Sequence, residues 1–287
     1  MLVSLAPVRF SWSVQQLQRF YAQAADWPVD IVYLGETFCG KRRVLSWQQW
    51  QEIGENLVAA GKQVVYSSNS THDSSMSIMQ LQRMCKENDF QLEVADMGYL
   101  QLLQTRRRPH VVGHSINVGT KDKLARFAEL GMTRWVMPRQ ANIDYLVADM
   151  RLAQVYEQER NFEVETSVYG MFQSSASVYC TRDLDFNPLK DCKVDCDIGK
   201  LSMSWHDPQA IREATFVLSN HIARLAAWGA NVFRVVPNSA DMGPVLANVS
   251  AEVAKLSYVD LPMLLEQEWQ MLAEQRIENE LRMIGVQ

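Results

Sequence analysis

The sequence predicts an α/β protein that folds as a single (β/α)8 barrel, and three observations support this. Eight short runs of β-branched or apolar residues recur along the 287 residues, and helical periodicity follows most of them. The connections between these segments are mostly short, as in parallel sheets built from right-handed crossovers. No low-complexity linker or break in composition divides the chain, so we expect one domain over residues 1–287.

The expected strands are short and bounded by polar or helical segments. In chain order they are Leu2–Ala6, Val29–Leu34, Gln63–Ser67, Phe90–Ala95, Val111–Ser115, Arg134–Met137, Phe162–Tyr169 and Asn231–Val236. Eight strand–helix units in a chain of this length favour a closed, TIM-like barrel over an open doubly wound sheet.

Several expected helices carry start and stop signals. Ser13 precedes a one-faced apolar stripe. Ser46, with Gln49 three residues later, forms a capping-box pattern, and Gly61 suits the left-handed position that ends a helix. Thr120 can cap the next helix. Further helical patterns cover about Ser75–Asn88, Ile143–Glu159, Gln209–Trp228 and Leu261–Met283.

The composition excludes several classes of protein. With 47% hydrophobic and 21% charged residues, the chain can bury a large core and is neither disordered nor collagen-like. Its net charge of −5 gives no general footprint for nucleic acid, which is not an expected partner. The start, MLVSLAPVRFSW, lacks secretory signal features, and no stretch is apolar enough to span a membrane. We therefore expect a cytoplasmic protein with reduced cysteines.

Four of the five cysteines fall in two places. Cys39 lies just past the second expected strand, and a long irregular stretch at about 170–207, after the seventh, contains Cys180, Cys192 and Cys196. A long loop inside a compact domain usually carries function or disorder. Loops that leave the carboxyl ends of barrel strands share one face, where active sites lie. The four cysteines can therefore converge although they are far apart in the sequence.

The spacing of the cysteines leaves three interpretations open. Four thiolates suit an iron–sulfur cluster or a tetrahedral zinc ion. Structural zinc usually takes its ligands from two tight Cys pairs, and only Cys192 and Cys196 approach such a pair, so a 4Fe-4S cluster fits somewhat better. Unliganded thiols are the third interpretation. Cys85 shares a helical face with Ile78 and Leu81, which favours core packing.

A resemblance to a known family rests on several segments. They are SLAPVRFSW, DIVYLGETFCGKRR, GKQVVYSS, VADMGYLQLL, VVGHSINV and GMTRWVMPRQ, with YCTR and KDCKVDC in the cysteine loop. In these segments the chain resembles the UbiV-type branch of the peptidase U32 family. The likeness covers most of residues 1–170, and the carboxyl-terminal third matches weakly. Where relatives tend to have Gly-Arg after the seventh strand, this chain has Gly170 and Met171.

The resemblance implies a function and a set of ligands. It implies a 4Fe-4S cluster on Cys39, Cys180, Cys192 and Cys196, in a subunit of an O2-independent hydroxylation system of ubiquinone biosynthesis. It also implies a heterodimer with a UbiU-type partner, a ubiquinone precursor as substrate, and prephenate as the oxygen donor. The alternatives are a non-catalytic electron-relay or structural subunit, and RNA base hydroxylation as in other U32 relatives. Motifs of peptidase chemistry are absent from the sequence.

Four residues near the expected strand ends, and one basic run, are further candidates. Glu36 is a candidate catalytic acid or base, or else a carboxylate that caps a turn. His114 is a candidate catalytic residue that supplies a proton or hydrogen bond, or else a structural histidine. Arg42 and Arg43 are candidates for tuning a cluster and binding an anionic substrate, or else belong to a solvated turn. The basic run ending at Arg108 is an RNA contact or a solvated loop.

Overall fold

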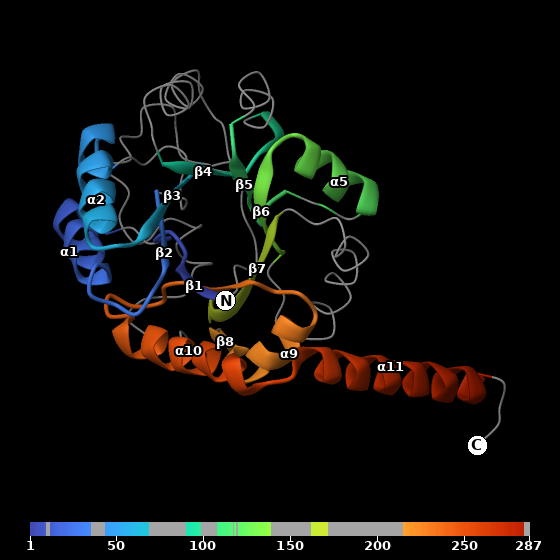
Figure 1. Cartoon of the computed structure of the whole chain (residues 1–287). Helices are drawn as coiled ribbons and strands as arrows, with labels where there is room; N and C mark the ends of the chain where they lie inside the picture. Colours follow the sequence, from blue (N-terminus) through green and yellow to red (C-terminus); the bar gives the residue numbers. More distant parts are fainter. Residues whose placement is uncertain are drawn as a thin grey trace.

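The computed structural model describes residues 1–9, 12–35, 44–68, 90–98, 108–116, 118, 120–138, 162–171 and 215–283. Eight parallel strands form a closed ring (Figure 1). They are β1 (Leu2–Leu5), β2 (Ile31–Leu34), β3 (Gln63–Ser67), β4 (Gln91–Val94), β5 (His110–Val112), β6 (Met132–Val136), β7 (Glu163–Met171) and β9 (Val232–Val235). Each pairs with the next, and β9 pairs with β1, so the expected (β/α)8 barrel is confirmed.

The expected helix over Gln209–Trp228 is wrong at residues 215–217 and confirmed at residues 222–227, which form α9. Residues 215–217 instead form β8 (Thr215–Val217), which pairs antiparallel with the carboxyl end of β7. Phe216 is buried while Val217 is exposed, an alternation of period two. The strand β7 extends past the ring, and its last residues pair with residues 215–217. This strand pairing prevails over the helical pattern of the sequence. Only α9 (Ile222–Ala227), after a short η1 (Ser219–His221), is helical.

The described helices lie outside the ring of strands (Figure 1). They are α1 (Val14–Ala24), α2 (Trp47–Ala59), α5 (Lys121–Glu129), α9, α10 (Gly243–Lys255), the short η2 (Leu256–Tyr258) and α11 (Leu261–Met283). The capping box of Ser46 and Gln49 is present, and Gly61 follows α2 with a φ of 81°. Thr120 caps α5 through a hydrogen bond from the backbone of Lys123. The expected helices at 75–88 and 143–159 lie outside the described residues.

The helix α11 extends away from the barrel at its carboxyl end (Figure 1). Near its start, Glu268 accepts a hydrogen bond of 2.7 Å from Arg224 of α9. Trp269 packs on Trp228 with 5.0 Å between the ring centroids. No helix in the described part of the chain is long and apolar enough to span a membrane.

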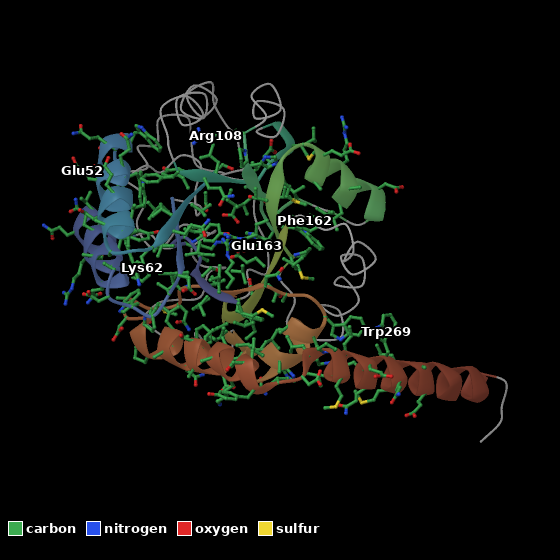
Figure 2. All side chains as sticks on the ribbon, in the orientation of Figure 1. Glu52, Lys62, Arg108, Phe162, Glu163 and Trp269 are labelled. Carbon is green, nitrogen blue, oxygen red and sulfur yellow. The ribbon has the colours of Figure 1, made fainter. Side chains whose placement is uncertain are left out.

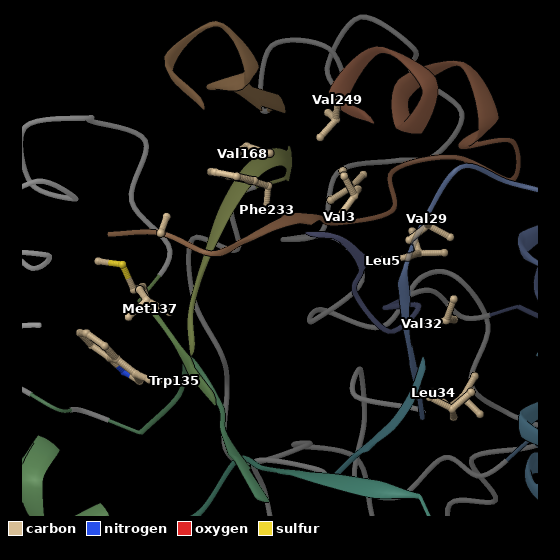
Figure 3. Close-up of a cluster of buried hydrophobic side chains, with 14 of the residues drawn as sticks. Val3, Leu5, Val29, Val32, Leu34, Trp135, Met137, Val168, Phe233 and Val249 are labelled. Atoms are coloured by element: carbon tan, nitrogen blue, oxygen red, sulfur yellow. The ribbon is translucent and has the colours of Figure 1, made fainter. Parts of the chain in front are cut away.

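The apolar core has two shells. The outer shell lies between the strands and the helices and includes Val3, Val32 and Phe233, with Val249 from α10 (Figure 3). The inner shell fills the barrel. Its buried members are Ile31, Tyr33, Val65, Val111, Val136 and Val232. Because successive side chains of a strand point to opposite faces, one strand can contribute to both shells, as β2 does with Val32 in the outer shell and Tyr33 in the inner shell.

His110, the first residue of β5, is a titratable side chain buried in the fold. Its side chain is fully buried, and Nδ1 donates to the carbonyl of Arg108 at 3.0 Å. Nε2 has no hydrogen-bond partner in the described structure. Burial therefore lowers the pKa of His110, while the backbone hydrogen bond opposes this shift.

We expect His110 to make the protein less stable below neutral pH. Because the folded pKa lies below the unfolded value of about 6.5, the unfolded state takes up the proton first as the pH falls. The free energy of unfolding should therefore decrease between pH 7.5 and 5.5, and by less in the His110→Gln variant. Urea unfolding at both pH values measures this difference. An equal decrease in the two proteins would show that His110 is not responsible.

Candidate functional site

The interior of the barrel contains buried charges in addition to its apolar shell. Arg234 of β9 donates through Nη1 to Glu93 Oε1 of β4 and to Glu165 Oε1 of β7, at 3.1 Å each. Nη2 makes a second contact with Glu93, at 3.4 Å. The guanidinium also lies 4.1 Å from the centroid of the Tyr33 ring. All of these side chains are buried, so one cation is shared by two carboxylates away from water.

A second arginine completes this network. Arg134 of β6 donates to Glu163 through Nε and Nη2, at 2.8 and 2.7 Å, and through Nη1 to the hydroxyl of Tyr33 at 3.1 Å. Glu165 accepts hydrogen bonds from the hydroxyls of Ser4, at 2.7 Å, and Tyr33. Figure 2 shows side chains filling the interior of the ring.

The network holds defined protonation states. Burial raises the pKa of the Tyr33 hydroxyl, and the negative charge of Glu165 raises it further. Burial acts to lower the pKa of Arg134 and Arg234, but the adjacent anionic groups outweigh it, and both pKa values are raised. Tyr33 therefore remains a neutral donor and both arginines remain cations at neutral pH.

Sequence reasoning missed the network, although each strand carries a local signal. In the expected strands a charged residue stands between apolar neighbours, as in Leu92-Glu93-Val94 and Phe233-Arg234-Val235. Such a residue in a strand buried on both faces has to point into the barrel and find a partner there. Arg234 and Glu93 are separated by 141 positions in the sequence. Only closure of the ring brings the two side chains together.

A pocket opens above this network at the carboxyl ends of the strands. Its empty volume is about 420 Å3, part of which is open to solvent. Segments that follow β1, β3, β4 and β5 line it, and Glu93 and Arg234 of the interior network also contribute. The lining residues are Ala6, Pro7, Arg9, Ser68, Glu93, Ala95, Gly113, His114, Ser115 and Arg234.

Hydrogen bonds connect the segments that line the pocket. The backbone amide of Ala95 donates to Ser68 Oγ at 3.0 Å, and Ser115 Oγ donates to the carbonyl of Ala95 at 2.6 Å. A Cβ on Gly113 would lie 2.8 Å from a carbonyl oxygen of β4 and 3.3 Å from Glu93 Cγ. Glycine is therefore required for β5 to approach the pocket floor this closely.

Arg9 adds a second cation to the pocket. Burial lowers its pKa to about 10, the positive charge of Arg234 acts in the same direction, and Glu93 opposes them. Arg9 is still protonated at neutral pH. The described charged residues that line the pocket include the guanidinium groups of Arg9 and Arg234 and the carboxylate of Glu93, and Glu93 is paired with Arg234.

The structure places only part of the sequence-predicted site. His114 is partly buried and lines the pocket, while its catalytic role stays a prediction. Arg108 donates to the carbonyl of Phe90 at 3.0 Å. The remaining candidates lie outside the described residues. They are Glu36, Cys39, Arg42, Arg43, Cys85, Arg106, Arg107, Cys180, Cys192 and Cys196.

The two cysteine-bearing segments leave the barrel at the carboxyl ends of β2 and β7, the end of the barrel at which the pocket lies. The chain enters segment 36–43 from Gly35, directly after β2, and segment 172–214 from Met171, the last residue of β7. Both are carboxyl ends of barrel strands, as is the pocket. Among the described residues, no three His, Cys, Asp or Glu side chains gather as metal ligands.

Comparisons with solved structures identify the fold. The chain is similar to the phospho-2-dehydro-3-deoxyheptonate aldolase of Thermotoga maritima, with a TM-score of 0.51 and 10% identity over 89% of this chain and 69% of that one. The fold is that of a TIM barrel. A second similar structure is the dihydropteroate synthase of Xanthomonas albilineans, with a TM-score of 0.49 and 12% identity over 91% and 94% of the chains. No family model matches the sequence.

Proposed function

We propose that the chain is the iron–sulfur subunit of an O2-independent hydroxylation system in ubiquinone biosynthesis, working with a UbiU-type partner. One observation carries the proposal. The two cysteine-bearing segments follow β2 and β7, whose carboxyl ends belong to the same mouth of the barrel. The resemblance of the sequence to UbiV-type proteins of the peptidase U32 family supplies the activity and the partner.

The chemistry of the donor set supports a 4Fe-4S cluster. Cys39, Cys180, Cys192 and Cys196 would hold it, and four thiolates are its usual ligands. When bound, the group supplies one-electron transfer, while the protein supplies position and electrostatic environment.

The pocket residues have separate tasks in this proposal. Arg9 contributes a positive charge to the pocket wall, and an arginine at this position is compatible with an anionic substrate. His114, in the pocket wall, can donate a hydrogen bond or a proton to a substrate oxygen. The buried network of Glu93, Glu165 and Arg234 fixes the floor of the pocket, because each carboxylate is hydrogen-bonded.

The test of the function is product formation without oxygen. The chain and its partner are produced together anaerobically, and hydroxylation of a ubiquinone precursor is followed by mass spectrometry. We expect Cys39→Ala to abolish the product and Cys85→Ala to preserve it, because only Cys39 is a proposed ligand. Full activity of the Cys39→Ala variant would contradict the proposal.

The His114→Gln variant distinguishes a catalytic subunit from an electron-relay subunit. Loss of product with iron content and partner binding intact favours catalysis at this pocket, because only the donor at the pocket wall has changed. Unchanged product favours the relay. RNA hydroxylation receives less support, because Arg108 of the basic run is hydrogen-bonded to the Phe90 carbonyl.

A further inference from the structure

We propose that Tyr33 and Glu165 are positioning residues that hold the two cysteine-bearing segments in a fixed relation to each other. Tyr33 lies on β2, which leads into segment 36–43, and Glu165 lies on β7, which leads into segment 172–214. The hydroxyl of Tyr33 donates to the carboxylate of Glu165 inside the barrel. The inference rests on the proposed function, because the bond has this purpose only if the two segments bind one cluster.

This hydrogen bond joins two strands that are not neighbours in the ring. The strand order places β1 and β9 between β2 and β7. Along that route the pairing of β7 with β9 is irregular between Ser167 and Tyr169. The contact from Tyr33 to Glu165 therefore links β2 to β7 directly, without the two intervening strands.

Other side chains fix both ends of the bond. Arg134 Nη1 donates to the Tyr33 hydroxyl at 3.1 Å, and the Arg234 guanidinium lies 4.1 Å from the centroid of the Tyr33 ring. Glu165 also accepts from Ser4 Oγ at 2.7 Å and from Arg234 Nη1 at 3.1 Å. Tyr33 and Glu165 are both fully buried, so water does not compete for their polar groups and the bond keeps its geometry.

The end of β2 carries this position into the first segment. Only Leu34 and Gly35 separate Tyr33 from segment 36–43, and both are buried. A Cβ on Gly35 would lie 2.7 Å from the carbonyl oxygen of Ser67, so the chain leaves β2 in close contact with β3. A shift of Tyr33 therefore moves the point from which Cys39 is presented.

The end of β7 is held on both sides. Its last three residues pair with β8, and the backbone amide of Val236 donates to the carbonyl of Tyr169 at 2.8 Å. These pairings stiffen the strand between Glu165 and segment 172–214. A shift of Glu165 therefore reaches the start of the segment that contains the other three proposed ligands.

The chemistry of the bond favours positioning over stability. A buried ionised network often stabilises a fold no better than apolar side chains of similar volume. It does provide a defined geometry, because hydrogen bonds are directional. Groups behind the ligands of a metal commonly orient those ligands in this way.

The rate at which a chelator removes iron tests the proposal. The anaerobically purified chain is mixed with excess EDTA, and loss of the cluster is followed by its visible absorbance. We expect Tyr33→Phe to lose iron faster, by about threefold or more. Phenylalanine keeps the ring that faces Arg234 but cannot donate to Glu165.

Ser4→Ala is the matched control. It removes a hydrogen bond to the same carboxylate of Glu165, but from β1, after which no proposed ligand occurs before β2. We expect Ser4→Ala to lose iron at the rate of the unmodified chain. A general weakening of the buried network would instead accelerate iron loss equally in Ser4→Ala and Tyr33→Phe.

The electron paramagnetic resonance spectrum of the reduced chain adds a readout that a merely structural role would not move. We expect Tyr33→Phe to broaden the signal of the cluster, because thiolates that are held less strictly give a wider range of cluster geometries. Ser4→Ala should leave the signal unchanged. An unchanged signal in folded Tyr33→Phe would contradict the positioning role.

Glu165→Gln tests the other end of the bond. Its amide leaves one oxygen to be shared by Tyr33, Ser4 and Arg234, so iron loss should again be faster, by about twofold or more. Urea unfolding shows which variants are folded. Iron loss at the unmodified rate from a folded Tyr33→Phe or Glu165→Gln variant, or equal acceleration in Ser4→Ala and Tyr33→Phe, would overturn the proposal.

The iron content of the unmodified chain separates this proposal from the proposed function. Normal iron content together with equal iron loss from Tyr33→Phe and Ser4→Ala would overturn the positioning role alone. Absence of iron from the unmodified chain would contradict the proposed cluster and, with it, this inference.

Discussion

Replacing Arg234 with methionine is expected to lower the free energy of unfolding by about 3–5 kcal/mol. The change leaves Glu93 and Glu165 in the barrel without the cation that they share at 3.1 Å. Both carboxylates are at least 95% buried, so water has little access to replace the lost hydrogen bonds. Urea unfolding followed by circular dichroism at neutral pH measures the loss.

A matched control separates burial from charge. Arg126→Gln removes a cation that lies 2.9 Å from Glu129, in a pair whose two side chains are 67% and 65% exposed. We expect that change to cost less than about 1 kcal/mol, because solvent screens exposed ion pairs. Adding Glu165→Gln to Arg234→Met should recover part of the loss, since one of the two buried negative charges is then removed. Equal costs at Arg234 and Arg126 would show that the buried network does not stabilise the barrel.

The closed barrel could be predicted because each strand carries its own signal. All eight strands of the ring lie where the apolar runs predicted them, and Gln63–Ser67 has the same ends in the structure. Helix starts with polar caps, such as Ser46 and Thr120, were also predictable, since capping depends on residues three apart. Each of these signals lies within a few residues of the strand or helix that it predicts, so it can be recognised without knowledge of tertiary contacts.

The missing elements depend on tertiary contacts or lack local signals. The strand β8 forms because the end of β7 extends past the ring and pairs with it, and the strand-favouring residues Thr215, Phe216 and Val217 are too short a run to stand out in the sequence. The helix α10 was not expected, because Met242 before it provides no side-chain cap. Pro244 in its first turn was the available signal.

Of the residues that line the pocket, His114 could be predicted from the sequence and Arg9 could not. His114 could be placed at the mouth, because it lies at the carboxyl end of the fifth expected strand, Val111–Ser115. Arg9 gave no local sign of a role, since nothing in the neighbouring sequence indicates that Arg234 would be close to it. Only closure of the ring between β1 and β9 brings the two arginines to one pocket.

Replacement of any one proposed cysteine ligand is expected to remove most of the bound iron. The four ligands surround one cluster, so a missing thiolate weakens the hold on the entire group. The variants are Cys39→Ala, Cys180→Ala, Cys192→Ala and Cys196→Ala. Cys85→Ala is the matched control, because the same thiol is removed at a position predicted to pack in the core.

Iron and acid-labile sulfide analysis of the anaerobically purified chain tests most directly whether four distant cysteines bind one cluster. We expect about four iron and four sulfide ions per chain, an amount unchanged in Cys85→Ala and reduced by more than about half in each of the four ligand variants. Zinc without a visible chromophore, or full iron content in Cys39→Ala, would contradict the proposed cluster.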